Sequence, residues 1–197
     1  TIGEQVWMAE NLAYLPSVVG PATGSDTDPY YYVYGFDGGT VAEAKATANY
    51  ITYGVLYNWP AALTACPSGW HLPIGAEWTQ LGEYLIANGY NYDGTTTGNK
   101  IAISLASATG WEDAHNSPGV IGNTNTAYDA YRNKSGFSAL PGGYRSYNGT
   151  FYYVRYLGYW WSSTEYDTDN ARPRYLYCGD SDVYRGGYDK EDGFSVR

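Results

Sequence analysis

The stretch YWWSSTEYDTDNARPRYLYCGDSDVYR, residues 159–185, decides the fold because its side chains alternate in character. Residues 174–177 read RYLY and residues 182–185 read DVYR, so tyrosine or aspartate occupies every second position. A period of two is that of a β-strand with one face inward and one face outward. We expect the inward set to be Arg174, Leu176, Val183 and Arg185, and the outward set to be Tyr175, Tyr177, Asp182 and Tyr184.

The rest of the second half has the same short-strand pattern. Strands are expected over residues 137–140, 142–145, 152–154 and 159–163, with turns at Asn148-Gly149 and Gly158 between them. Phe194 and Val196 close the chain as an inward-facing pair. Together these segments predict a small antiparallel sheet.

The first half contains the clearest helical pattern, over residues 75–88. Trp78, Leu81 and Leu85 recur there at three- and four-residue steps, and Gly89 can end the helix. Shorter helices are expected over residues 41–49 and 101–107, and residues 53–63 are expected to be the end of a strand that passes into a short helix. Extended segments are expected over 4–12 and 30–34, and a long polar loop over 110–135. The predicted fold class is therefore α+β, with short helices first and the sheet second.

Composition bounds the class of protein and its partners. A chain of 197 residues is expected to form one domain. The formal charge of -9, with no basic stripe, disfavours nucleic acid and anionic lipid as partners. No apolar run reaches the roughly 18 residues of a membrane span, and the chain opens on strand-like sequence without a signal peptide, so we expect no membrane insertion by this domain and a mature or trimmed form.

Seven motifs, in this order, make the chain resemble a known family. They are IGEQVWMAENL (2–12), YGVLYNWPAA (53–62), CPSGWHLP (66–73), AEWTQL (76–81), GFSALPGGYR (136–145), WWSSTE (160–165) and GFSVR (193–197). This combination resembles the Fibrobacter succinogenes major paralogous domain family over nearly the whole chain. The resemblance implies a C-type-lectin-like fold, related to formylglycine-generating enzyme folds, on exported or surface-attached proteins.

Two departures from the family pattern have physical consequences. Family members commonly carry Ser or Thr before the helix at 75–88, whereas this chain has Ile74, so the helix loses a cap worth roughly 1 kcal/mol unless another group replaces it. By sequence alone, Cys66 and Cys178 can pair, stay free or have partners elsewhere. Relatives tend to have a Cys directly after GFSVR, which the resemblance pairs with the position of Cys66. Since this chain ends at Arg197, Cys66 is expected to be unpaired here.

A second resemblance concerns the last quarter of the chain, with a variable binding region at residues 147–192. Diversity-generating retroelements miscopy template adenines into the C-terminal coding region of some C-type-lectin-like proteins. Eleven of the 24 tyrosines fall between Tyr144 and Tyr188, among Asp, Asn, Gly and Ser, which resembles such a product. The resemblance implies these ligand-binding residues: Tyr152, Tyr153, Arg155, Tyr156, Tyr166, Asp167, Asp169, Asn170, Arg172, Tyr175, Tyr177, Asp180, Asp182, Tyr184, Tyr188 and Asp189.

Tyrosine suits recognition because its rigid amphipathic ring offers large contact area with few torsions to freeze. Together with this chemistry, the two resemblances imply a recognition protein, extracellular on a cell surface or virion, that binds a protein or glycan on another cell, and we expect it to be monomeric. An undiversified glycan-binding or adhesive module of the same fold is the alternative. Tyrosine also populates strands readily, so an ordinary tyrosine-covered sheet fits the same pattern.

Other candidate sites are weaker. Trp59, Trp70, Trp78, Trp160 and Trp161 stand in apolar motifs and are expected in the core rather than as sugar platforms. His71, between Trp70 and Leu72, is expected to be a hydrogen-bonded buried imidazole, and Glu165 with Arg197 could form a framework ion pair.

Enzyme and cofactor chemistry lacks its usual residues. There is no Ser-His-Asp set, zinc spacing or phosphate loop, and Cys66 and Cys178 do not form the reactive pair that formylglycine generation needs. The acidic runs at 167–170 and 180–182 lack the Gly and distal Glu of an EF-hand, and the EPN, QPD and WND triplets of calcium-dependent lectins are absent. We expect no catalysis, no cofactor and no metal.

Overall fold

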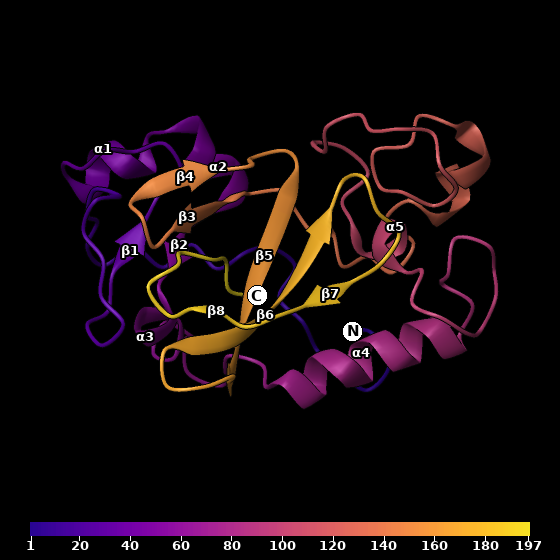
Figure 1. The fold of residues 1–197 in the computed structure, drawn as a ribbon, viewed down its shortest axis with the longest axis horizontal. Coiled ribbons are helices and arrows are strands. Elements are labelled where there is room, and N and C mark those ends of the chain that lie inside the picture. The colour runs from indigo at the N-terminus through magenta and orange to yellow at the C-terminus, as the bar shows by residue number, and fades with distance from the viewer.

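Short helices occupy the first half of the chain and the longest strands the second, as Figure 1 shows for this computed structural model, which describes all residues 1–197. The helices are α1 (Val41–Lys45), α2 (Ala48–Tyr53), α3 (Trp59–Ala62), α4 (Gly75–Ala87), α5 (Ala102–Leu105) and the 3-10 helix η1 (Thr126–Tyr131). The strands are β1 (Tyr31–Tyr32), β2 (Leu56–Tyr57), β3 (Tyr144–Ser146), β4 (Thr150–Tyr152), β5 (Leu157–Glu165), β6 (Asn170–Tyr177), β7 (Tyr184–Arg185) and β8 (Tyr188–Asp189). The predicted α+β class is confirmed. No helix is both long and apolar enough to cross a membrane.

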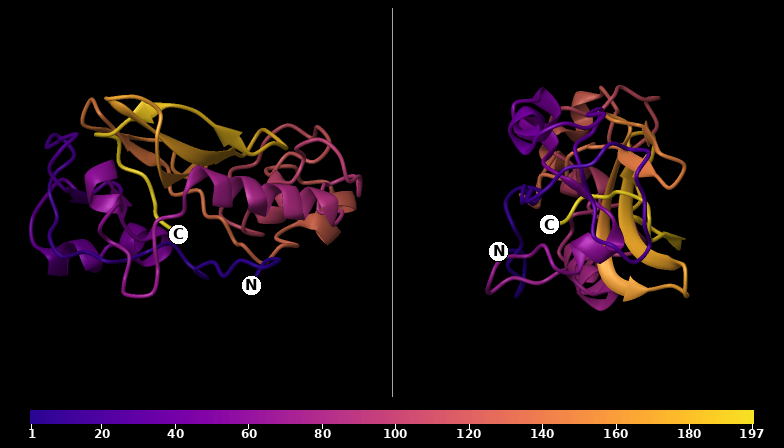
Figure 2. Two further views of the ribbon diagram at one scale, coloured as in Figure 1. Left: turned by 90° about the horizontal axis from the view of Figure 1, so that it is seen from below. Right: turned by 90° about the vertical axis from the view of Figure 1, so that its left-hand side faces the viewer.

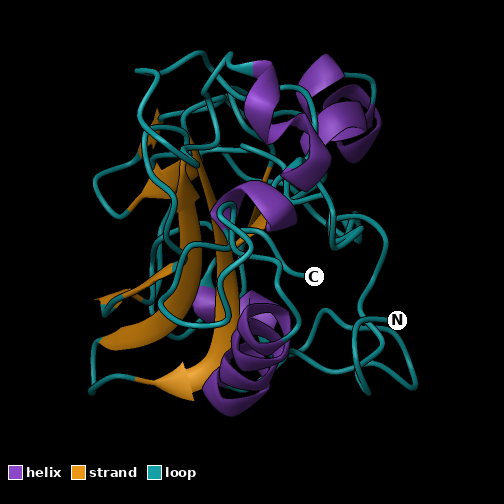
Figure 3. Cartoon of the chain, turned by 90° about the vertical axis from the view of Figure 1, so that its right-hand side faces the viewer, coloured by secondary structure: helices purple, strands orange, loops and turns teal.

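The main sheet joins strands that are close in sequence. It has the order β5-β6-β7, with β8 pairing the other end of β6, and every pairing is antiparallel. The sheet lies along one side of the molecule, with α4 packed beneath it (Figure 2), and the strands gather on the side away from most helices (Figure 3). Tyr175 pairs with Tyr159 on one side and Tyr184 on the other, so the three rings share one face of the sheet.

Two clusters of buried side chains hold the sheet from its two faces. Trp161 and Phe194, with ring centroids 4.3 Å apart, belong to the cluster that includes β1, β2 and α3. Trp160 and Leu176 belong to the cluster that includes α4 and α5. Consecutive residues of one strand therefore enter different cores, as a period of two requires. The inward pair Phe194 and Val196 is confirmed, since both are buried.

The predicted helix over residues 75–88 is confirmed as α4, and its N-terminus is capped by groups other than the side chain of residue 74. Trp78, Leu81 and Leu85 are buried, and the helix begins at Gly75. Ile74 supplies no side-chain cap, but Thr164 of β5 accepts a hydrogen bond from the Gly75 N–H at 2.9 Å, and the Glu77 carboxylate accepts one from the Ile74 N–H at 2.8 Å. The lost cap is thus replaced by a strand residue distant in sequence.

Several predicted segments are shorter or divided. Residues 41–49 form α1 and the start of α2, because Thr47 caps a new helix by accepting from the Tyr50 N–H. Residues 4–12 and 137–140 contain no strand, only isolated bridges nearby at Ile2–Gln5 and Ala106–Ala139. The strand expected at 152–154 is β4, which ends at Tyr152, and the loop at 110–135 includes η1.

Four side chains depart from the sequence prediction because burial is decided by distant segments. His71 is exposed rather than buried and hydrogen-bonds the Glu77 carboxylate at 2.9 Å. Trp70 is 41% exposed, whereas Trp78, Trp160 and Trp161 are buried and Trp59 is half-buried. Arg185 shares the α4 side of the sheet with Arg174 but is exposed, since β7 is at the sheet edge. Cys66 and Cys178 do not form a disulfide with each other.

The expected ion pair between Glu165 and Arg197 is wrong. Glu165 instead pairs with Lys190 at 2.7 Å. Arg197 donates to the backbone oxygens of Ala9 and Ser138, at 2.6 and 3.3 Å, and its guanidinium lies 4.4 Å from the Phe137 ring centroid. Burial lowers the pKa of Arg197 to about 10, so this side chain is a charged member of the framework at neutral pH.

Candidate ligand-binding surface

None of the sixteen predicted binding residues is buried. They are exposed or half-buried, whereas Trp160, Trp161 and Leu176, which stand between them in sequence, are buried. Six of the sixteen line one open cleft of about 580 Å³, namely Tyr153, Tyr156, Tyr175, Tyr177, Asp180 and Tyr184. The cleft is hereafter called the tyrosine cleft.

Three neighbouring segments form the tyrosine cleft. The turn between β4 and β5 supplies Tyr153 and Tyr156, β6 supplies Tyr175 and Tyr177, and the following loop leads through Asp180 to Tyr184. The segments meet because Leu157 pairs with Tyr177 in the β5–β6 register, and because the Cys178 N–H donates to the Tyr156 carbonyl at 2.9 Å. Local strand pairing therefore places residues from positions 153 to 184 around one opening.

A stacked row of rings forms the wall of the cleft. The Tyr159 and Tyr175 ring centroids are 4.8 Å apart with an interplanar angle of 23°, and those of Tyr175 and Tyr184 are 5.0 Å apart at 17°. Tyr188 meets the row edge-on, 5.3 Å from Tyr159. Since both faces of the Tyr175 ring are covered by neighbours, this ring offers its edge and hydroxyl to a ligand rather than a stacking surface.

Two other rings of the cleft, those of Tyr156 and Tyr177, are free. Tyr156 and Tyr177 are each 43% exposed, and neither is paired with another aromatic ring. Tyr153 is 55% exposed and has a φ of 59°, a backbone conformation that few residues other than glycine adopt. Tyr156 and Tyr177 can therefore offer ring faces to an incoming molecule, whereas the Tyr153 ring already stacks on Tyr144, with centroids 6.3 Å apart.

The polar groups of the cleft are hydrogen-bonded and fixed in place. Asp180 accepts from the Ser181 N–H at 2.7 Å and from the Tyr184 hydroxyl. The hydrogen bond to Asp180, followed by burial, raises the pKa of Tyr184, while burial raises that of Tyr175 to about 12. Both phenols therefore remain protonated near neutral pH, so the wall of the cleft keeps its hydroxyl groups.

Six predicted residues lie outside the cleft, in the β5–β6 turn and in the parts of β6 and β8 next to that turn. They are Tyr166, Asp167, Asp169, Asn170, Arg172 and Asp189. Asp167 accepts from the backbone N–H groups of Asp169 and Asn170 at 3.0 and 2.9 Å, and the Arg172 guanidinium lies 4.5 Å from the Tyr166 ring centroid. The hydrogen bond from the Asn170 side chain is the main cause that lowers the pKa of Asp167. These contacts close the turn upon itself.

The remaining predicted residues border the cleft without lining it. Arg155 forms an ion pair with Glu112 at 3.2 Å, and Tyr152 packs with Tyr153 and Tyr144. Asp182, whose pKa is raised by burial, follows Asp180 in the same loop, and Tyr188 packs against the stacked row. Sequence reasoning missed Leu157 and Tyr159 as lining residues. Tyr159 is itself buried, at 5% exposure, so it lines the cleft from the framework beneath it.

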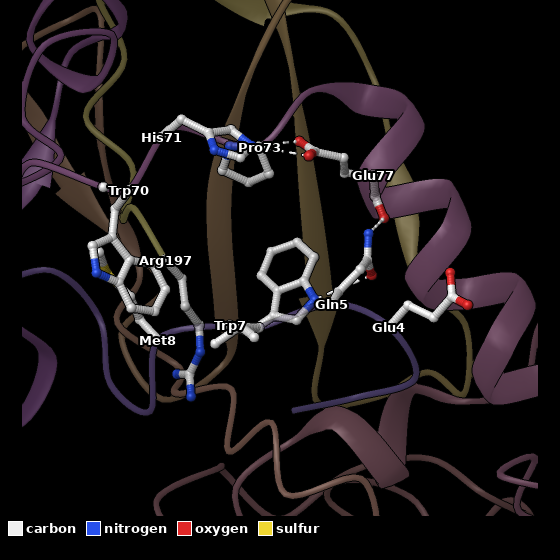
Figure 4. A pocket seen from close by; sticks show the side chains of 11 residues that line it. Glu4, Gln5, Trp7, Met8, Trp70, His71, Pro73, Glu77 and Arg197 are labelled. Carbon is white, nitrogen blue, oxygen red and sulfur yellow. Dashed lines mark hydrogen bonds and ion pairs between the residues drawn. The ribbon is translucent and has the colours of Figure 1, made fainter.

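A second pocket, of about 450 Å³, is formed near the two chain ends (Figure 4). Its walls include Trp70, the His71–Glu77 pair, Trp7 and Arg197, and none of the sixteen predicted residues. Gln5 links the walls by donating to the Glu77 carbonyl at 2.9 Å and accepting from the Trp7 indole at 3.2 Å. The pocket thus combines exposed indole surface with polar groups that are held in place.

No group of three or more His, Cys, Asp or Glu side chains is arranged to hold a metal ion. In comparison with known proteins, the family model described as the Fibrobacter succinogenes major domain matches residues 1–197. No curated protein matches the chain, and no solved structure matches it.

Proposed function

We propose that this chain, which belongs to the Fibrobacter succinogenes major domain family, recognises a protein or glycan on another cell through the tyrosine cleft. One observation carries the proposal: six residues implied by the retroelement resemblance line a single open cleft above a buried framework. An interface of rigid tyrosines with small polar neighbours is the composition of an adaptable binding site.

The proposal includes diversification of this surface by a retroelement. Its physical support is the separation of roles within one strand, since Tyr175 and Tyr177 line the cleft while Arg174 and Leu176 are buried. Exposed residues of the cleft such as Tyr177 can change without creating cavities, whereas changes to the buried side chains cost several kcal/mol. A recognition protein of this kind acts outside the cell, on a cell surface or virion, and performs no catalysis.

Sibling gene copies and the neighbouring DNA test the diversification directly. The proposal predicts differences concentrated at the residues of the tyrosine cleft, and a nearby adenine-bearing template beside a reverse transcriptase gene. Differences scattered evenly over the sequence, with no template repeat, would contradict diversification and leave the binding proposal to the next experiment.

Binding is tested on an array of surface glycans and on whole bacterial cells. Tyr177→Ala and Tyr156→Ala remove free rings of the cleft and are expected to weaken any binding by about tenfold each, as for anchor residues of an interface. Tyr14→Ala is the matched control, because Tyr14 is also exposed but lies outside the cleft. Equal loss in all three variants, or loss in none, would count against the tyrosine cleft.

An undiversified glycan-binding module is the second candidate, and the exposed Trp70 favours it. The Trp70 ring lies on the wall of the pocket in Figure 4, beside Met8 and the Arg197 guanidinium. An indole with polar groups beside it suits a sugar ring. Array binding that is lost in Trp70→Ala and retained in Tyr177→Ala would support this candidate over the tyrosine cleft.

A further inference from the structure

The α4 side of the sheet contains two buried hydrogen-bond donors without partners. Arg174 is only 7% exposed, and its Nη2 donates to the Gly75 carbonyl at 3.0 Å and to the Thr79 hydroxyl at 3.3 Å. Its Nη1 is buried and has no partner, and the same is true of Nε1 of the buried Trp78. An unpaired buried donor costs about 1–3 kcal/mol, so two in one place require an explanation.

Both residues line one pocket of about 220 Å³ between α4 and the strands β6 and β7. Arg185, the register partner of Arg174, also lines this pocket and is exposed. None of the sixteen predicted binding residues lines it, and it lies on the opposite face of the sheet from the stacked tyrosines. The pocket is therefore separate from the tyrosine cleft.

Positive charge gathers at this pocket although the protein as a whole carries a formal charge of -9. Neither Arg174 nor Arg185 has a carboxylate within ion-pair distance. Burial lowers the pKa of Arg174, and repulsion from Arg185 and Arg172 lowers it further. A buried guanidinium without a counter-charge is costly, and an anion beside it would remove much of that cost.

A carboxylate fits this pocket better than a neutral group. Its oxygens can accept hydrogen bonds from the exposed Arg185 guanidinium, while its charge offsets both arginines. Glu83 also lines the pocket, but its carboxylate contacts neither arginine within ion-pair distance. We propose that this pocket binds a carboxylate group of a ligand, held by Arg174 and Arg185 beside the Trp78 indole.

The test uses three small carboxylates as probes, namely acetate, glucuronate and N-acetylglutamate, with methyl glucoside as the neutral control. NMR of the Trp78 indole N–H, assigned with Trp78→Phe, reports on changes at the wall of the pocket. We expect saturable shifts with the carboxylates and none with methyl glucoside. Tighter binding of glucuronate would identify an acidic sugar as the source of the carboxylate, and tighter binding of N-acetylglutamate an acidic side chain.

Two variants and a control distinguish the site from general charge effects. Arg185→Gln, at an exposed position, is expected to weaken carboxylate binding roughly threefold to tenfold, and Glu83→Gln to strengthen it by removing a like charge at the pocket. Tyr14→Ala, at an exposed position outside both this pocket and the tyrosine cleft, should leave the affinity unchanged. The absence of a saturable shift, or the same affinity in Arg185→Gln, would overturn the proposal.

Discussion

The two faces of β6 differ in what surrounds their side chains. On one face Tyr175 and Tyr177 border an open cleft, and on the other Arg174 and Leu176 are buried against α4. The two kinds of residue alternate in sequence, yet they belong to different physical units. A strand can therefore hold an exchangeable surface and a fixed framework at once, because successive side chains share no contacts across the sheet.

The largest expected difference is between alanine substitutions of two adjacent residues of β6 that lie on opposite faces. Leu176→Ala removes a buried side chain and is expected to reduce the free energy of unfolding by about 2–5 kcal/mol. Tyr177→Ala, the adjacent residue with an exposed ring, is expected to change it by no more than about 0.5 kcal/mol. Urea unfolding measures both, and similar losses in the two variants would break the comparison.

Titration of a buried carboxyl sharpens the same contrast. Burial raises the pKa of Asp192 to about 7, whereas hydrogen bonds lower that of the exposed Asp167. Because the folded protein holds the Asp192 proton more tightly than the unfolded chain does, its contribution to stability is present below pH 4 and is lost as the pH rises to about 7.

Stability measured across that range should therefore fall by up to ~1.4 kcal/mol per pH unit, from this group alone. Asp192→Asn keeps the carbonyl that accepts from the Tyr147 N–H and should remove this dependence. An unchanged pH profile in the variant would assign the dependence to other groups.

Among the tyrosines of the cleft, removing a stacked ring and removing a free ring should differ by a smaller amount of unfolding free energy. Tyr175→Ala breaks contacts with Tyr159 and Tyr184 and is expected to cost about 1–2 kcal/mol, more than Tyr177→Ala. Tyr175→Phe retains the stack and should be close to the original protein in thermal unfolding. If Tyr175→Ala is as stable as Tyr177→Ala, the row is not a structural element.

The smallest effect concerns the contact that joins the sheet to α4. Thr164→Val removes the hydroxyl that accepts from the Gly75 N–H and is expected to cost about 1 kcal/mol of unfolding free energy. Adding Ile74→Ser should restore part of it by supplying a local cap. If Thr164→Val lowers the free energy of unfolding by the same amount with and without Ile74→Ser, Thr164 does not act as a cap.

Sequence reasoning found the parts of the fold that are set locally. The repeat of Trp78, Leu81 and Leu85 fixed α4, and the alternation around Tyr175 fixed the faces of β6. It failed where burial depends on distant segments. Trp70 and His71 stand in an apolar motif but lie on the wall of an open pocket, and the edge position of β7 leaves Arg185 exposed.

The sequence predicted which kinds of residue form the candidate site, but only some of the predicted residues lie together in the cleft. Composition alone cannot distinguish the tyrosines of the cleft from Tyr166 and Asp167, because tyrosine and aspartate occur near both ends of β6. Leu157 and Tyr159 also line the cleft but were not predicted. They belong to β5, whose neighbouring residues in sequence were assigned to the buried framework. The unpaired donors of Arg174 and Trp78 have no sequence signal, because they depend on the packing of α4 against β6.

A substitution scan of residues 152–192 tests the central claim most directly. Every single variant is displayed, and the folded fraction is selected by resistance to protease. We predict that Tyr156 and Tyr177 accept nearly all residues, that Tyr175 accepts fewer, and that Trp160, Trp161 and Leu176 accept almost none. Equal tolerance along the segment, or intolerance at Tyr156 and Tyr177, would contradict an exchangeable face on a fixed framework.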